Sequence, residues 1–130
     1  MNLPVKNVQR SREFFSAIGF GFRAQMSSAH SLCMTVSEKN IVFMLFEEPM
    51  FRGFTNGAVC DTREGSEVLI SFSAESREQV DEMAAKVKAA GGHIYGGPGD
   101  NQGWMYGMGF TDPDGHKWNM LYMDRSKMPQ

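Results

Sequence analysis

The chain of 130 residues has the length of one domain with a substantial hydrophobic core. Apolar residues make up 42% and charged residues 22% of it, which excludes the disordered and fibrous classes. Thirteen Lys and Arg against fifteen Asp and Glu leave a net charge of -2, so the charge indicates no nucleic-acid partner. The longest apolar run, residues 41–46, is far too short for a membrane span, and we expect no membrane partner.

The two cysteines, Cys33 and Cys60, lack the CxxC spacing of zinc or dithiol redox sites. The first twenty residues carry several charged side chains between Lys6 and Glu13 and no apolar signal segment. We therefore expect a cytoplasmic protein with reduced thiols.

The first half of the chain predicts strands around a single helix. Asn7 is a suitable N-cap, apolar residues from Val8 to Ile18 recur at helical spacing, and Gly19 is a suitable stop, so a helix is predicted over 8–18. A turn is expected at residues 37–40. The predicted strands cover residues 1–5, 20–25, 32–36 and 41–46.

The second half repeats this order after an irregular segment. Residues 49–65 predict a connection with a helical turn around 49–54. Ser76 and Gln79 form a capping-box pair, and a helix is predicted over 76–90. The glycine-rich residues 96–99 predict a turn or loop. The predicted strands cover residues 67–73, 93–95, 103–111 and 117–123.

The repeated order predicts an α+β fold of two tandem βαβββ modules. We assign residues 1–130 to a single domain. Its first module covers about 1–48, the connector about 49–65, and the second module about 66–130.

Two groups of residues carry a resemblance to a known family. In the first half they are residues 3–7 (LPVKN), the Phe14-Phe15 pair and residues 18–20 (IGF). In the second half they are residues 105–107 (MYG), Phe110 and residues 112–118 (DPDGHKW). With the order of elements, they resemble the vicinal oxygen chelate superfamily, which includes glyoxalase I, bleomycin resistance proteins and extradiol dioxygenases. The resemblance implies that the strands of both modules curl into a bowl of mixed sheet. It also implies helices outside the bowl and a ligand inside it.

The resemblance also implies where a divalent metal would be held in metal-dependent members. In the first strand the position lies five residues before Val5, and thus before Met1. In the fourth strand it falls on Met44, or on Phe43 with a shift of one residue. Counted back from Phe72 the fifth-strand position is Glu67, and the eighth-strand position is Asn119. One carboxylate and one amide are a poor donor set for Mn, Fe, Ni or Zn, so we expect no metal cofactor.

The same positions supply the candidate ligand-binding residues. Strand alternation places Glu67 and Asn119 on the bowl face, with Trp104 or Tyr106 expected on the wall of the same cavity and Met44 as a further lining residue. Glu67 has two interpretations, a solvated strand start or an inward carboxylate that acts as general base or anchors a ligand amine. His116 is interpreted as a surface residue that shapes the last hairpin.

Three functions remain open. The first is a superfamily member that binds a small molecule without the usual metal, with or without an enzymatic activity. The second is a non-catalytic protein that sequesters a drug or metabolite. The third is a metal-dependent lyase of the glyoxalase type. We also expect a homodimer, because the resemblance implies one and because Met50, Phe51 and Phe54 offer apolar surface in the connector.

Overall fold

The computed structural model describes residues 1–36 and 41–128, so the turn predicted at 37–40 lies outside the described residues. The chain divides into two compact units, Met1–Asp61 and Thr62–Gln130. Each contains one four-stranded mixed sheet.

The first unit has the strand order β1-β4-β3-β2, with β1 parallel to β4 and the other pairs antiparallel. The strand predicted at 20–25 is shorter than expected, because β2 ends at Phe22 and a 3₁₀ turn follows. The helical turn predicted around 49–54 is a helix of 8 residues. The elements are β1 (Asn2–Val5), α1 (Val8–Ala17), β2 (Gly21–Phe22), η1 (Ala24–Met26), β3 (Ser31–Val36), β4 (Ile41–Glu47) and α2 (Glu48–Thr55).

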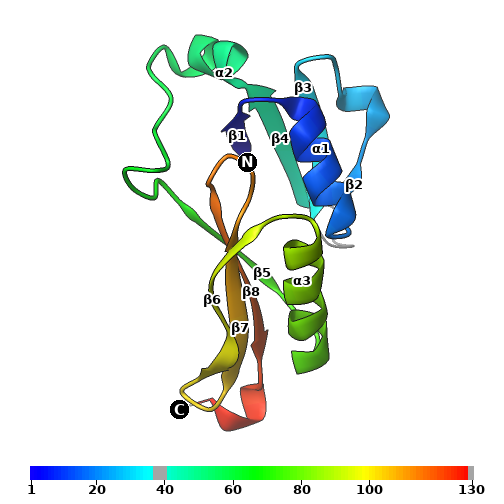
Figure 1. Ribbon diagram of the computed structural model, residues 1–130, viewed down its shortest axis with the longest axis vertical. Helices are drawn as coiled ribbons and strands as arrows, with labels where there is room; N and C mark the ends of the chain where they lie inside the picture. The colour runs from blue at the N-terminus through cyan, green and yellow to red at the C-terminus, as the bar shows by residue number, and fades with distance from the viewer. Residues whose placement is uncertain (37–40, 129–130) are drawn as a thin grey trace. The chain divides into compact units, whose positions relative to one another are not determined.

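Helix α1 begins where the sequence predicts. The Asn7 side chain accepts a hydrogen bond from the backbone N–H of Arg10 at 2.9 Å, which satisfies one of the free donors of the first turn. Phe14 and Phe15 are buried, and Ile18 is 1% exposed just beyond the helix. The apolar stripe of α1 therefore packs into the core of the first unit (Figure 1).

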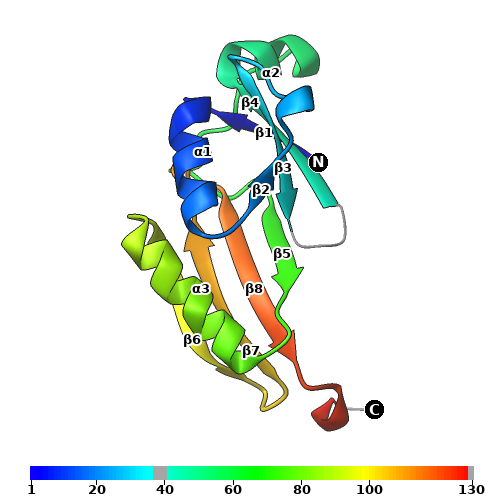
Figure 2. The same ribbon diagram turned by 90° about the vertical axis from the view of Figure 1, so that its right-hand side faces the viewer.

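The second unit repeats the arrangement, with the strand order β5-β8-β7-β6 and β5 parallel to β8. Helix α3 packs on β6, β7 and β8 and covers one face of this sheet (Figure 2). The predicted α+β fold of two tandem βαβββ modules is confirmed. The elements are β5 (Leu69–Ser73), α3 (Arg77–Ala89), β6 (His93–Asn101), β7 (Met105–Thr111), β8 (Lys117–Met123) and η2 (Arg125–Lys127).

The core of the second unit is built around Trp118. Trp118 and Phe110 are both 0% exposed, and their rings stack with centroids 6.2 Å apart and planes 6° apart. Phe72 meets both rings edge-on. Full burial of one such side chain stabilises a fold by roughly 1.5–3 kcal/mol. These rings therefore hold β5, β7 and β8 together on the face that α3 covers.

The glycine-rich residues 96–99 are not a separate loop, as the sequence predicted, but part of the nine-residue strand β6. The pairing of β6 with β7 shifts register between Ile94 and Gly96 and again between Gly96 and Gly99. Glycine suits such irregularities because it adopts backbone conformations closed to other residues, and Gly97 has a φ of 73°.

Within residues 1–36 and 41–128, no helix is long and apolar enough to cross a membrane.

The N-cap of α3 provides a test of the helix boundary. The Ser76 side chain accepts from the backbone N–H of Gln79 at 3.1 Å. Ser76→Ala removes this acceptor and should lower the free energy of unfolding by about 1 kcal/mol. Urea denaturation measures the loss. Ser16→Ala, on the exposed side of α1, is the control and should be neutral or slightly stabilising. Equal effects of the two variants would contradict the assigned cap.

Candidate functional site

The two faces of the second sheet differ sharply. Trp118 and Met120 of β8 are buried on the face that α3 covers, so alternation places Asn119 on the opposite, open face. Asn119 pairs in register with Ser71 of β5 on one side and Gly109 of β7 on the other. Asn119 thus lies on the sheet face opposite Trp118, as strand alternation predicts.

A cavity of about 180 Å³ lies on this open face. The side-chain oxygen Oδ1 of Asn119 is buried and has no hydrogen-bond partner within the described part of the chain. An unsatisfied buried acceptor costs about 1–3 kcal/mol, so a donor from a bound molecule would be stabilised here. The cavity is lined by Tyr95, Gly96, Gly99, Asn101, Met105, Gly107, Met108, Gly109, Asn119 and Leu121.

Two glycines of β7, Gly107 and Gly109, line the cavity, and neighbouring side chains approach both of them closely. A Cβ atom at Gly109 would overlap the phenol ring of Tyr95, and one at Gly107 would lie 2.5 Å from a methyl carbon of Leu121. Gly107 and Gly109 alternate with Met108 and Phe110, which are buried on the other face. Gly107 and Gly109 therefore allow Leu121 and Tyr95 to pack directly against the backbone of β7.

Tyr95 is a lining residue that the sequence analysis missed. Its hydroxyl donates to the backbone carbonyl of Trp118 at 3.1 Å, which holds the ring across Gly109. Burial raises the pKa of Tyr95 above its ordinary value of 10, so the phenol is neutral at pH 7. The sequence feature that could have indicated this contact is Gly109, because a glycine within a strand often marks a site where another group approaches the backbone closely.

Tyr106 and Trp104 do not form the predicted wall beside Asn119. Tyr106 lies on the face covered by α3, where its hydroxyl donates to Asp81 of that helix at 2.6 Å. Trp104 lies in the turn before β7 instead of within the strand, and its ring N–H is 3.4 Å from the Gln102 side-chain oxygen. The expected arrangement is wrong for both, because β7 begins at Met105 and its even-numbered residues face α3.

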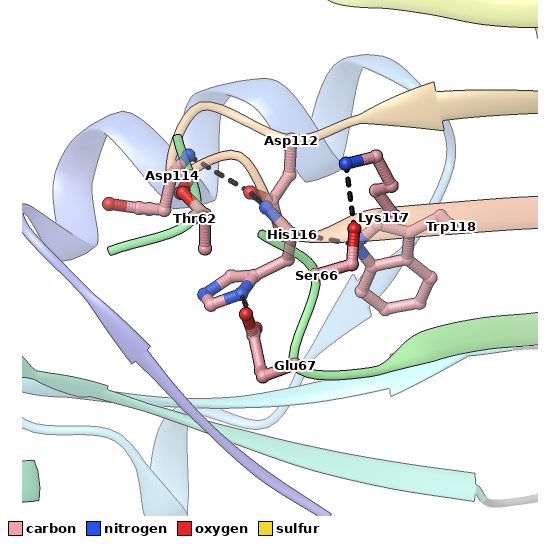
Figure 3. A network of polar contacts seen from close by, with 8 residues as sticks. All are labelled: Thr62, Ser66, Glu67, Asp112, Asp114, His116, Lys117 and Trp118. Atoms are coloured by element: carbon pink, nitrogen blue, oxygen red, sulfur yellow. Dashed lines mark hydrogen bonds and ion pairs between the residues drawn. The ribbon is translucent and has the colours of Figure 1, made fainter. Parts of the chain in front are cut away.

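Glu67 contacts a different group from the one expected. It lies two residues before the start of β5, and its Oε1 is 2.7 Å from Nδ1 of His116 (Figure 3). His116 is 3% exposed, so its interpretation as a surface histidine is wrong. Glu67 does not line the cavity beside Asn119, and the predicted common cavity for the two side chains is corrected. Its role as general base or anchor stays a prediction.

The contact between Glu67 and His116 belongs to a network that ties residues 62–67 to the β7–β8 turn. The Thr62 hydroxyl donates to the Asp114 carbonyl at 2.6 Å, and the Lys117 ammonium donates to the Ser66 hydroxyl at 2.8 Å (Figure 3). Three side-chain contacts thus hold the segment that leads into β5 against the start of β8.

Asp112 is the buried centre of the same turn. Its carboxylate accepts from the backbone N–H groups of Asp114 and His116 and from the indole N–H of Trp118. Burial raises the pKa of Asp112 to about 6, while His116 and the indole N–H oppose the shift. Three converging donors explain a carboxyl group that is only 6% exposed.

The helix caps show which residues of β1 and β5 correspond. Val5 lies two residues before the N-cap Asn7, and Ala74 lies two residues before the N-cap Ser76. The resemblance places the metal-ligand position of the first strand five residues before Val5. The same count back from Ala74 leads to Leu69, so Leu69 and not Glu67 occupies the corresponding position at β5. Leu69 has no donor atom.

The strand registers show that Met44 and Asn119 correspond. Asn2, five residues before the first N-cap, pairs with Met44, and Ser71, five residues before the second, pairs with Asn119. Met44 lies in the first unit, on the face opposite the buried Phe43.

Comparison with known proteins identifies the family of this chain. The family model described as Glyoxalase/Bleomycin resistance protein/Dioxygenase superfamily matches residues 1–120. The chain belongs to this superfamily. Comparison with curated protein sequences finds no match.

Solved structures of similar fold span nearly the whole chain. The hypothetical protein SA1046 from S. aureus is 30% identical, with a TM-score of 0.83 over 94% of this chain and 90% of that one. A superfamily enzyme from Burkholderia phytofirmans PsJN is 14% identical, with a TM-score of 0.80 and 95% of each chain covered. The fosfomycin resistance protein FosX from Listeria monocytogenes, solved with Mn(II) and sulfate, is 19% identical. Its TM-score is 0.71, and the match covers 97% of this chain and 89% of that one.

In the second unit, the positions that the resemblance assigns to ligands of a divalent transition metal hold an alkyl group at Leu69 and a neutral amide at Asn119. Neither side chain fits such a metal ion. Such ions favour imidazole, carboxylate and thiolate ligands. Among residues 1–36 and 41–128, no three His, Cys, Asp or Glu side chains gather as a metal site.

The raised pKa of Asp112 predicts a pH dependence of stability. Because the folded-state pKa of about 6 exceeds the ordinary aspartate pKa of 3.8, the folded state binds the proton more tightly. Asp112 should therefore make the free energy of unfolding decrease as pH rises from about 4 to 6. Asp112→Asn should remove this contribution. Urea denaturation across pH 4–7 measures it, with the exposed Glu13→Gln as control. An unchanged pH profile in Asp112→Asn would contradict the assignment.

Proposed function

We propose that this superfamily member binds a small molecule in the cavity beside Asn119 and does so without a divalent metal. The observation that supports this most directly is that Asn119 lines a cavity of about 180 Å³ and that its buried Oδ1 has no hydrogen-bond partner among the described residues. Small-molecule sites typically combine apolar walls with a few placed polar groups. Met105 and Leu121 supply such walls here.

The chemistry of the lining favours binding over catalysis. It contains no carboxyl, imidazole or thiol group, and its single titratable side chain is the phenol of Tyr95. Proton transfer at neutral pH needs a group with a pKa near 7, whereas burial moves the pKa of Tyr95 upward. A sequestering protein is therefore favoured over a lyase within this cavity.

An enzymatic function would need Glu67 and His116. Their contact of 2.7 Å joins a carboxylate to an imidazole, as in many general-base sites. His116 is only 3% exposed, and the pair is engaged in holding the β7–β8 turn. The metal-dependent lyase is disfavoured by the side chains of Leu69 and Asn119 in the second unit.

Asn119→Leu tests the binding proposal. Removal of an unsatisfied buried acceptor should raise the free energy of unfolding by about 1 kcal/mol, while compounds that stabilise the wild type should no longer raise its Tm. Thermal-shift screening of both proteins with a library of single-ring compounds measures the difference. Gln9→Leu, at an exposed position of α1, is the matched control. Compounds that shift the Tm of the wild type and of Asn119→Leu equally would overturn the site.

We also propose that the chain forms a homodimer through the outer face of α2. Phe54 is 67% and Met50 37% exposed, and Phe54 meets Phe46 of β4 edge-on at 5.0 Å. A groove lined by Asn2, Phe46, Phe51, Phe54 and Thr55 accompanies this apolar surface. Exposed aromatic clusters of this kind mark protein interfaces. A cytoplasmic location remains part of the proposal, supported by the free thiols of Cys33 and Cys60.

Phe54→Asp tests the dimer. A carboxylate in an apolar interface is expensive to desolvate, so the variant should be monomeric at tens of micromolar, where the wild type is dimeric. Size-exclusion chromatography with light scattering measures the mass. Met128→Asp places the same charge on an exposed apolar residue outside α2 and should leave the dimer intact. A monomeric wild type would refute the proposal.

A further inference from the structure

We infer that the Asn119 cavity selects uncharged, single-ring aromatic compounds that carry one O–H or N–H donor. This inference rests on the proposed binding function and specifies its ligand class. Size, charge and hydrogen bonding of the lining each contribute to it.

The size of the cavity matches one ring. Its volume is about 180 Å³, and an apolar protein cavity of about 150 Å³ binds benzene. Gly107 and Gly109 let Leu121 and the ring of Tyr95 pack close to β7, and both side chains line the cavity. A planar molecule can lie against the Tyr95 ring with more contact than a branched one of equal volume.

The charge of the lining disfavours ions. None of the ten lining residues carries a formal charge at pH 7. The charged groups nearest in sequence are engaged elsewhere. The Lys117 ammonium donates to the Ser66 hydroxyl at 2.8 Å, and the Asp100 carboxylate pairs with Arg77 at 2.8 Å. An ionised ligand would lose its hydration in this cavity without gaining a counter-charge.

The hydrogen-bonding pattern requires a donor. Among residues 1–36 and 41–128, Oδ1 of Asn119 is an acceptor without a partner, whereas the Tyr95 hydroxyl already donates to the Trp118 carbonyl. A ligand hydroxyl or N–H is therefore the complement that the cavity lacks. Gly109 pairs directly with Asn119, and the Tyr95 ring lies across Gly109. A ligand that binds Asn119 therefore has its ring beside the Tyr95 phenol.

Phenol, anisole and benzoate are the probes that test this inference. Phenol has the ring and the donor, anisole replaces the donor with a methyl ether, and benzoate replaces it with a negative charge. Titration of the isotope-labelled full chain, followed by amide NMR shifts of Gly107, Gly109 and Asn119, gives a Kd for each probe. Phenol should bind about threefold to tenfold more tightly than anisole, as one net hydrogen bond predicts. Benzoate should bind more weakly than both.

Asn119→Leu should bind phenol and anisole equally, because the acceptor is gone while the ring contacts remain. Gln9→Leu should keep the wild-type preference for phenol. A folded spectrum of each variant shows that the fold is intact.

The outcomes separate the ligand class from the binding function. Equal affinity of the wild type for phenol and anisole, or tightest binding of benzoate at these same amides, would overturn the ligand class and leave the binding site standing. If no probe moves these amides and no library compound distinguishes the wild type from Asn119→Leu, the binding function fails with it.

Discussion

Burial of Trp118 is the constraint on which the second unit depends. Its ring is fully buried against Phe110 beneath α3, and its indole N–H satisfies the buried carboxylate of Asp112 in the preceding turn. Its backbone carbonyl accepts from the Tyr95 hydroxyl on the other side of the sheet. One residue therefore links the hydrophobic core, the β7–β8 turn and the cavity. Because Trp118 must face α3, its neighbour Asn119 must face the open side.

The cavity follows from the alternation of large residues and glycines along β7. Its large residues, Met108 and Phe110, fill the core, whereas the alternate positions, Gly107 and Gly109, lie under Leu121 and Tyr95 on the opposite face. The glycines cost backbone entropy and contribute no packing on that side. What they allow is the close approach of Tyr95 and Leu121 to the strand, so the glycines that weaken the strand also shape the pocket.

The superfamily fold is present in both units of the chain. Both βαβββ modules are intact, and their helix caps and strand registers correspond residue by residue between the two units. The second-unit positions that the resemblance assigns to metal ligands hold Leu69 and Asn119. Packing maintains the fold through the alternate residues of the same strands, so the open face is free to change its chemistry. The carboxylate of Glu67 has meanwhile a structural partner, the buried His116.

The sequence by itself determined the order of the elements, both helix N-caps and the face on which Asn119 lies. These features are local, since caps and alternation depend on residues a few positions apart. Only the tertiary structure decided that Tyr106 contacts α3, that Tyr95 crosses Gly109 and that His116 is buried against Glu67. Each of these contacts joins residues 14 to 49 positions apart and depends on strand pairing and helix placement. The assignment of Leu69 instead of Glu67 to the fifth-strand position also required the alignment of the two helix caps. Local periodicity carries no information on such long-range register, because it is the packing of the whole core that selects one pairing among several with similar local patterns.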